Sequence, residues 1–132
     1  MRINKNMKNF SLNSNNLIPL DMTYLESRFF GDSKLLSEVL IHFKKNCRIS
    51  LKEMKSCLSN GQITGLINET HKLRGSLVNI MQNSLTTRLK EIEIEAGKKY
   101  NINLTIEEIN YFENELFKII TYLKTVANKW KK

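Results

Sequence analysis

The feature that most constrains this fold is the spacing of the apolar residues, which recur every three or four positions along several long stretches. The longest such series consists of Ile109, Phe112, Leu116, Ile119, Leu123, Val126 and Trp130. This spacing places the side chains on one face of an α-helix, where neighbouring helices can bury them. The chain of 132 residues has one proline, so little interrupts such helices. The pattern therefore predicts an all-α fold.

Capping residues predict where the first two helices lie. Asp21 is a candidate N-cap for a short first helix, and Gly31 is expected to end it. Asp32 or Ser33 then caps a long second helix over 33–59. The apolar residues expected on the inner face of the first helix are Met22, Leu25, Phe29 and Phe30. Those expected on the inner face of the second helix are Leu36, Leu40, Phe43, Cys47, Met54 and Leu58.

Turn residues divide the remainder of the chain into three further helices. Asn60-Gly61 ends the second helix, and a third is expected over 62–80. A fourth helix begins at Asn83 or Ser84 and ends near Gly97. The apolar residues expected on its inner face are Leu85, Leu89, Ile92 and Ala96.

A capping box predicts the start of the fifth helix. Thr105 is the N-cap, and Glu108 follows three residues later, the spacing at which each residue satisfies a backbone N–H group of the other. Four long amphipathic helices with short links predict an antiparallel up-down four-helix bundle. The short additional N-terminal helix is expected to cover one end of that bundle.

The length and the N-terminal composition predict one domain with a tail. Residues 1–20 contain Arg2, Lys5 and Lys8 with no acidic residue, which favours a flexible basic tail before a domain over 21–132. No apolar run approaches the roughly 18 residues of a membrane span, and no secretory signal is present. We expect a cytoplasmic monomer, and Met1 and the short chain favour a free-standing protein.

The chain is basic, with a formal net charge of +8 from 21 basic and 13 acidic side chains. Part of this charge lies in one stretch of the second helix, where Glu53 is the single acid. The basic residues of that stretch are Lys44, Lys45, Arg48, Lys52 and Lys55. A basic surface is compatible with nucleic acid or with an acidic protein partner, and basic tails are often only solubilising.

Three other residues with reactive side chains fit structural or surface roles. Cys47 and Cys57 have no metal-ligand spacing, and ten helical residues separate them by about 15 Å, too far for a disulfide. Both are expected to be small apolar residues of the core. His42 lies one step off the inner face of its helix and has no second ligand at helical spacing, which predicts a surface residue.

A different arrangement surrounds His71. The inner face of this helix consists of Leu66, Thr70, Leu73, Leu77 and Ile80. His71 lies beside that face and shares a neighbouring one with Arg74 and Gly75, and also with Ile67 and Val78. An accessible imidazole beside a fixed cation, with clear space above it, is suited to carry a phosphoryl group. A lone helical histidine is nevertheless most often a solvated surface residue or a satisfied core residue.

The residues around His71 resemble a family signature. His71-Lys72-Leu73-Arg74-Gly75-Ser76 is similar to the His-x-Leu-Lys/Arg-Gly-Ser motif of histidine-containing phosphotransfer (HPt) domains of two-component phosphorelays. Asn79-Ile80 also resembles the family pattern, but Met81 stands where the family commonly has glycine. The helical layout over 21–130 is similar too. The resemblance implies an HPt-like bundle over 21–132.

The resemblance also implies a function. His71 would accept a phosphoryl group from an aspartate of one receiver domain and pass it to another, and the receivers would supply the metal. Arg74 would partly neutralise the phosphoryl group, whereas Lys72 lies about 100° round the helix. Ile67, Lys72 and Val78 would contact the partner. The sequence has no glycine-rich ATP loop and no clustered acidic pocket, so we expect a carrier without cofactor or metal, not an enzyme.

The hairpin between the third and fourth helices predicts a partner for His71. Its turn lies near Gln82, and His71 and Glu93 each lie eleven residues from that turn. The Glu93 carboxylate would accept a hydrogen bond from Nδ1–H of His71 and leave Nε2 as the nucleophile. Alternatively, Glu93 belongs to a solvated run with Glu91 and Glu95.

Two other functions remain open at this point. One is a receiver-binding adaptor or inhibitor that never carries phosphate, although an intact His71 argues against it. The other is a basic helical protein that binds nucleic acid. Its net charge fits, but the sequence shows no helix-turn-helix and its basic residues are spread along the chain.

Overall fold

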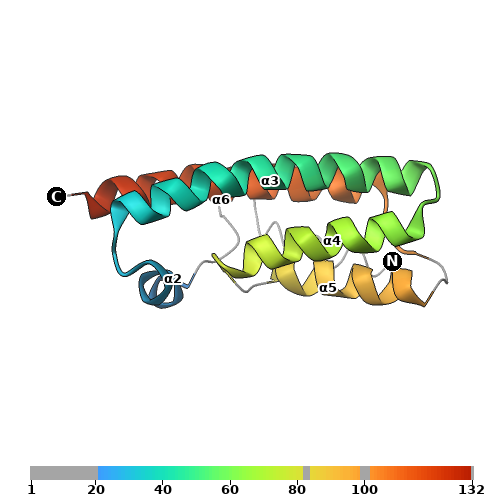
Figure 1. Ribbon diagram of the computed structural model, residues 1–132, viewed down its shortest axis with the longest axis horizontal. Helices are drawn as coiled ribbons and strands as arrows, with labels where there is room; N and C mark the ends of the chain where they lie inside the picture. The colour runs from blue at the N-terminus through green and yellow to red at the C-terminus, as the bar shows by residue number, and fades with distance from the viewer. Residues whose placement is uncertain (1–20, 82–83, 99–101, 132) are drawn as a thin grey trace.

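The computed structural model describes residues 21–81, 84–98 and 102–131, and this part of the chain is all-α. Its helices are α2 (Met22–Phe29), α3 (Ser33–Ser59), α4 (Ile63–Val78), α5 (Ser84–Gly97) and α6 (Ile106–Trp130). The long helices form two layers, with α3 beside α6 and α4 beside α5, and α3 also contacts α4 (Figure 1). The predicted tail and the possible helix start at Asn83 lie outside the described residues. Within the described part, no helix combines the length and apolar character of a membrane span.

The predicted apolar faces meet in one core between the layers. Every residue of the long C-terminal series is buried except Trp130, which is partly buried. Burial of each such side chain contributes about 1.5–3 kcal/mol. Leu66, Thr70, Leu73, Leu77 and Ile80 are also buried, as predicted. The periodicity therefore identifies the inward face of α4, from which His71 is excluded.

The core contains both cysteines as free thiols, as predicted. Burial raises the pKa of Cys47 to about 12. The pKa of Cys57 is raised too, first by burial and then by Glu53 and Glu69. Both sulfurs therefore remain protonated at neutral pH and behave as apolar groups. His42, in contrast, is exposed on α3, as predicted.

Side-chain caps fix the first two helices at their N-termini. Oδ1 of Asp21 accepts a hydrogen bond of 3.2 Å from the Tyr24 N–H, and Oδ1 of Asp32 accepts one of 3.1 Å from the Leu35 N–H. Each bond satisfies a backbone donor that has no partner inside its helix. The predicted caps therefore position α2 and α3.

The end of α2 differs from the prediction at Phe30. The helix ends before Phe30, whose φ of 57° lies in the left-handed region, and Gly31 follows with a φ of 67°. Phe30 is 81% exposed, so its predicted place on the inner face is wrong, whereas Phe29 is buried. The left-handed conformation turns the Phe30 side chain away from the core and is one that glycine adopts more readily.

The end of α4 also differs from the prediction. We expected a helix over 62–80, but α4 ends at Val78. The N–H groups of Ile80 and Met81 both donate to the Leu77 carbonyl at 2.9 Å, which closes a turn. Ile80 and Met81 are buried, so this turn folds back onto the core.

Of the two hydrogen bonds predicted for the capping box at α6, only the one accepted by Thr105 is present. The Glu108 N–H donates to Oγ1 of Thr105 at 3.1 Å, as expected. The Glu108 carboxylate, however, pairs with Arg88 of α5 through two bonds of 2.7 and 2.9 Å. Arg88 and Glu108 are 1% and 2% exposed. Burial alone would lower the pKa of Arg88, but its bonds to Glu108 outweigh that effect and raise it. This buried pair joins α5 to α6.

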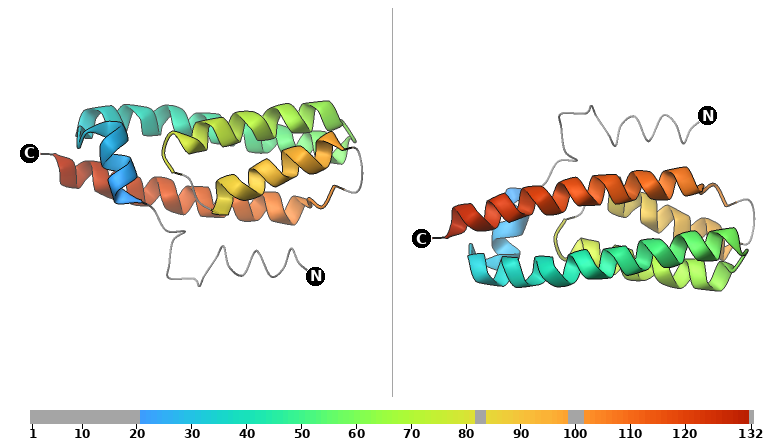
Figure 2. Two further views of the ribbon diagram at one scale, coloured as in Figure 1. Left: turned by 90° about the horizontal axis from the view of Figure 1, so that it is seen from below. Right: turned by 90° about the horizontal axis from the view of Figure 1, so that it is seen from above.

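The short helix α2 crosses one end of the long helices and contacts the end of α4 (Figure 2). The Tyr24 hydroxyl donates to the Val78 carbonyl at 2.5 Å. The Arg28 guanidinium donates to Oδ1 of Asn79 at 2.9 Å and stacks over the Tyr24 ring. These bonds place α2 two turns from His71, where it borders the same face.

Candidate functional site

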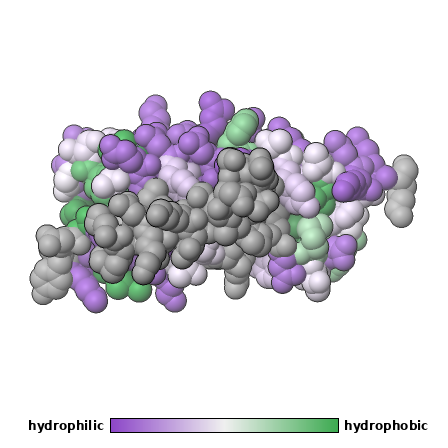
Figure 3. Space-filling model, turned by 180° about the vertical axis from the view of Figure 1, so that it is seen from behind, coloured by the Kyte–Doolittle hydropathy of each residue, from purple (hydrophilic) through white to green (hydrophobic). Residues whose placement is uncertain are grey.

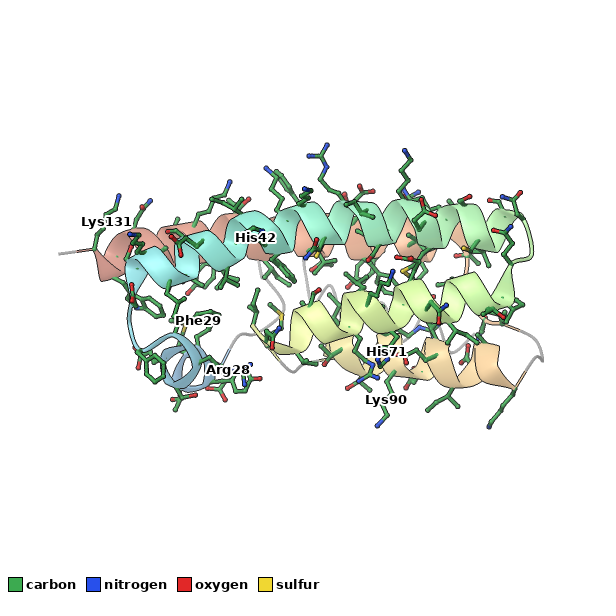
Figure 4. The ribbon with its side chains drawn as sticks, viewed as in Figure 1. Arg28, Phe29, His42, His71, Lys90 and Lys131 are labelled. Atoms are coloured by element: carbon green, nitrogen blue, oxygen red, sulfur yellow. The ribbon has the colours of Figure 1, made fainter. Side chains whose placement is uncertain are left out.

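His71 lies on the outer side of α4. Its side chain is 66% exposed, although Thr70 and Leu73 beside it are buried. Figure 4 shows the imidazole projecting away from the α3–α6 layer. The inward face of α4 is taken by apolar side chains, so the histidine is left accessible to a partner.

Glu93 of α5 holds one nitrogen of the imidazole. Its Oε1 lies 3.0 Å from Nδ1 of His71, and its side chain is 15% exposed. The contact that the hairpin register predicts is present. The alternative, that Glu93 is one member of a solvated run, does not hold because Glu93 is covered by His71 and Arg74.

Arg74 binds the same carboxylate. Its Nε donates to Oε2 of Glu93 at 2.5 Å, and its Nη2 donates to Oε1 at 3.4 Å. We expected Arg74 to face a phosphoryl group, and its guanidinium instead pairs with Glu93. The side chain remains 26% exposed on the same side of α4 as the histidine.

The contacts of Nδ1 assign the tautomer of His71. Nδ1 is 3.0 Å from a Glu93 oxygen, which can only accept, and 3.3 Å from Nη2 of Arg74, which can only donate. In the neutral imidazole, Nδ1 either carries a proton and donates or carries a lone pair and accepts, so it cannot form both hydrogen bonds. The shorter contact, to a carboxylate, favours a proton on Nδ1. Nε2 then carries the lone pair.

The electrostatic coupling keeps Glu93 ionised. Burial alone would raise the pKa of Glu93, but hydrogen bonds from Arg74 and His71 outweigh that effect and lower it. The same bond to Glu93 raises the pKa of Arg74. The site therefore holds a fixed carboxylate against Nδ1 at neutral pH.

Gly75 leaves open space one turn beyond His71. A Cβ atom added there would meet no atom within 4 Å, so the predicted clear space is present. Gly75 also lines a groove between α3 and α4. Gly65, on the same helix, is different because an added Cβ would lie 2.7 Å from Sγ of Cys57. Close packing therefore explains why residue 65 is glycine, and it does not explain why residue 75 is.

The remaining predicted site residues surround this centre. Ile67 and Val78 are partly buried, and they lie one and two turns from His71 along α4. Lys72 is exposed, lies 3.3 Å from Glu69 and lines the groove between α3 and α4. The structure therefore brings Arg74 and Glu93 together with His71, whereas Lys72 points toward α3.

Two cations that the sequence reasoning missed lie near this face. Figure 4 shows Lys90 of α5 and Arg28 of α2 projecting on the same side of the molecule as His71. Lys90 precedes Glu93 by three residues, and that spacing places both on neighbouring faces of α5. The spacing was visible in the sequence. Nothing in the sequence places Arg28, because α2 is remote from α4 in the chain.

Among the described residues, no group of three or more His, Cys, Asp and Glu side chains is arranged to hold a metal ion. Comparison with known proteins found no matching family model, no matching curated protein and no matching solved structure.

Proposed function

We propose that this protein is a phosphohistidine carrier of a two-component phosphorelay, an HPt-like protein that accepts a phosphoryl group on His71. The observation that carries the proposal is the pairing of an exposed imidazole with a fixed carboxylate. Glu93 holds Nδ1 at 3.0 Å, so Nε2 is the nitrogen left to react. Gly75 adds no side chain beside it.

In the proposed transfer, His71 supplies the nucleophile and the receiver supplies the phosphoryl group. The lone pair of Nε2 attacks the phosphorus of a receiver aspartyl phosphate. The bond from phosphorus to the aspartate oxygen breaks, and its electron pair returns to the aspartate as carboxylate. The imidazole gains positive charge, which the Glu93 carboxylate stabilises through Nδ1–H. Transfer to a second receiver reverses these steps.

Arg74 has an indirect part in this proposal. Its positive charge partly offsets the negative charge of the ionised Glu93, and its hydrogen bond fixes the orientation of that carboxylate. Because a carrier needs only positioning and charge stabilisation, ATP and metal would be left to the partners. We therefore propose a carrier and not an enzyme in its own right.

We propose that the four long helices form an antiparallel up-down bundle. The direction of the colour gradient reverses from each long helix to the next in Figure 1, which supports this arrangement. A bundle of this kind presents α4 as a rigid platform. Its transfer surface would need no rearrangement when a partner binds.

The receiver is proposed to dock over Ile67, His71, Gly75 and Val78. Ile67 and Val78 supply apolar contact on either side of His71 and Gly75, and Lys72 lies at the edge of this face. A surface that combines apolar residues with a polar rim suits a transient interface. The carrier would act as a cytoplasmic monomer, where receiver domains are available.

Phosphotransfer from a labelled receiver tests the proposal. Native protein should take up acid-labile label, and His71→Gln should take up none while keeping its helix content. His42→Gln is the matched control, since it removes the other histidine of the chain, which is also exposed. A protein that binds the receiver without taking up label would be an adaptor or inhibitor.

A further inference from the structure

A second surface lies on the α3–α6 layer, away from His71. It combines exposed apolar side chains with a strip of cations along α3. Ile41 and Ile49 of α3 are exposed, and Phe117 of α6 is 63% exposed. Figure 3 shows mainly hydrophilic side chains with apolar ones between them along the upper edge, where α3 and α6 lie. We call this region the α3–α6 surface.

An apolar groove runs through the α3–α6 surface. It has a volume of about 210 Å³, and Leu51 of α3 and Leu116, Phe117 and Ile120 of α6 form its apolar lining. Lys44 and Arg48 stand at its α3 edge. A larger groove of about 740 Å³ adjoins it along α3 and shares these two cations. The surface is therefore concave and carries its charge at one edge.

The charge of this surface is unbalanced. Its cations are Lys44, Lys45, Arg48, Lys52 and Lys55. The single carboxylate in the lining is Glu113, which lies 3.3 Å from Nζ of Lys55. The described residues supply no ion-pair partner for the other four cations. On α6, Lys118 lies 3.2 Å from Glu115, and Thr121 and Thr125 are uncharged. The positive charge that lines the groove without a partner therefore lies on α3.

We propose that the α3–α6 surface binds an acidic amphipathic helix of a partner protein. A groove between two adjacent helices accepts a third helix whose side-chain ridge fits into it. The cation strip from Lys44 to Lys55 spans eleven residues, about 16 Å, or three turns of a bound helix. Apolar residues of the partner would contact the exposed side chains of Ile41, Ile49 and Phe117, and acidic residues on one flank would face the cations.

The positive charge of the α3–α6 surface disfavours binding of a second copy of this protein or of its own N-terminal residues. A second copy docked through the same surface would oppose its cations to those of the first, which disfavours association. The N-terminal residues 1–20 contain three basic residues and no acid, so the cations would repel them. An acidic partner remains the complementary one. Because His71 lies on the other layer, both partners can bind at once, and this inference does not rest on the phosphotransfer proposal.

Fluorescence anisotropy with the full chain and a labelled synthetic peptide tests this inference. The peptide has 18 residues, with leucine at positions i, i+3, i+4 and i+7 and glutamate along one flank. We expect binding in the micromolar range at about 150 mM salt. Combining Arg48→Glu with Lys52→Glu should weaken binding by about tenfold or more, because attraction becomes repulsion. Phe117→Ala should weaken it by about fivefold or more through lost apolar contact.

Matched controls test whether peptide binding depends on the α3–α6 surface or only on the net positive charge of the protein. Combining Lys90→Glu of α5 with Lys98→Glu, in the turn that follows α5, reverses the same number of charges and should leave peptide binding unchanged, as should His71→Gln. Circular dichroism establishes that each variant retains its helix content. Equal binding of a peptide with lysine in place of glutamate would overturn the inference. Failure of the acidic peptide to bind would overturn it too, including when phosphatidylglycerol vesicles or duplex DNA bind instead.

Discussion

The Glu93 carboxylate links Arg74 to His71 by hydrogen bonds to both side chains. The Arg74 Nε atom lies 2.5 Å from Oε2 of Glu93, and the other oxygen of that carboxylate lies 3.0 Å from Nδ1 of His71. The three side chains come from two helices, so the packing of α4 against α5 sets the direction of the imidazole. In this arrangement Arg74 and Glu93 position the imidazole and His71 is the nucleophile, so each role can be tested by a separate substitution.

The first prediction concerns the acceptor at Glu93. Glu93→Gln should keep most of the transfer rate, because an amide oxygen can still accept the Nδ1–H bond. Glu93→Ala removes the acceptor and should slow transfer by about tenfold or more. The measurement is the initial rate of label uptake by His71 from a phosphorylated receiver. Equal rates in Glu93→Ala and native protein would show that the contact has no part in transfer.

The second prediction concerns stability at low pH. The pKa of Glu93 in the folded protein is lowered, so its ionised form is favoured by folding. The stability from this shift is fully present above the ordinary carboxyl pKa, about 4.3, and is lost as pH falls through the lowered value. Urea unfolding of native protein and Glu93→Gln should therefore differ most near pH 7, and the difference should shrink as pH falls through the lowered pKa of Glu93. A difference that stays constant with pH would contradict this coupling.

The third prediction compares two glycines of α4. Gly75→Ala should stabilise the protein by up to about 1 kcal/mol, because alanine is the better helix former and its Cβ meets open space. Gly65→Ala should destabilise it, because the new Cβ would lie 2.7 Å from Sγ of Cys57. Thermal unfolding measures both changes.

A double variant checks the cause of that difference. Adding Cys57→Ala to Gly65→Ala removes the sulfur that the new Cβ would meet, so part of the lost stability should return. If the two substitutions are simply additive, the contact between Gly65 and Cys57 does not limit the site.

The fourth prediction concerns the buried pair of Arg88 and Glu108. Arg88→Met leaves the Glu108 carboxylate buried without its cation and should cost about 3–5 kcal/mol. Replacing both residues, as Arg88→Met with Glu108→Leu, should restore much of that stability because no charge remains buried. Urea unfolding at pH 7 gives both values. A double variant as unstable as the single one would contradict this explanation.

The outcome at these residues shows what the sequence can predict. Helix positions and inward faces follow from the spacing of apolar residues, since burying one face is a property of each segment alone. The Glu93 contact was also predictable, because a short hairpin fixes the register of two consecutive helices. Both predictions depend on distances along the chain, and neither requires knowledge of how remote segments pack.

What the sequence did not predict depends on packing between remote segments. Arg88 has the character of a surface residue until Glu108 of α6, twenty positions later, is placed beside it. The same contact diverts the Glu108 carboxylate from its role in the capping box. Gly65 differs from Gly75 only because Cys57 of α3 lies against it. Phe30 is a local exception, because its exposure follows from a left-handed backbone angle that glycine would adopt more readily.

The position of the phosphoryl group on the imidazole ring tests the central claim most directly. The protein is phosphorylated by a labelled receiver, and two-dimensional NMR of the imidazole identifies the modified nitrogen and residue. Because Glu93 holds Nδ1, we predict phosphorylation at Nε2 of His71. Phosphorylation at Nδ1, phosphorylation of His42, or no phosphohistidine at all would contradict the account.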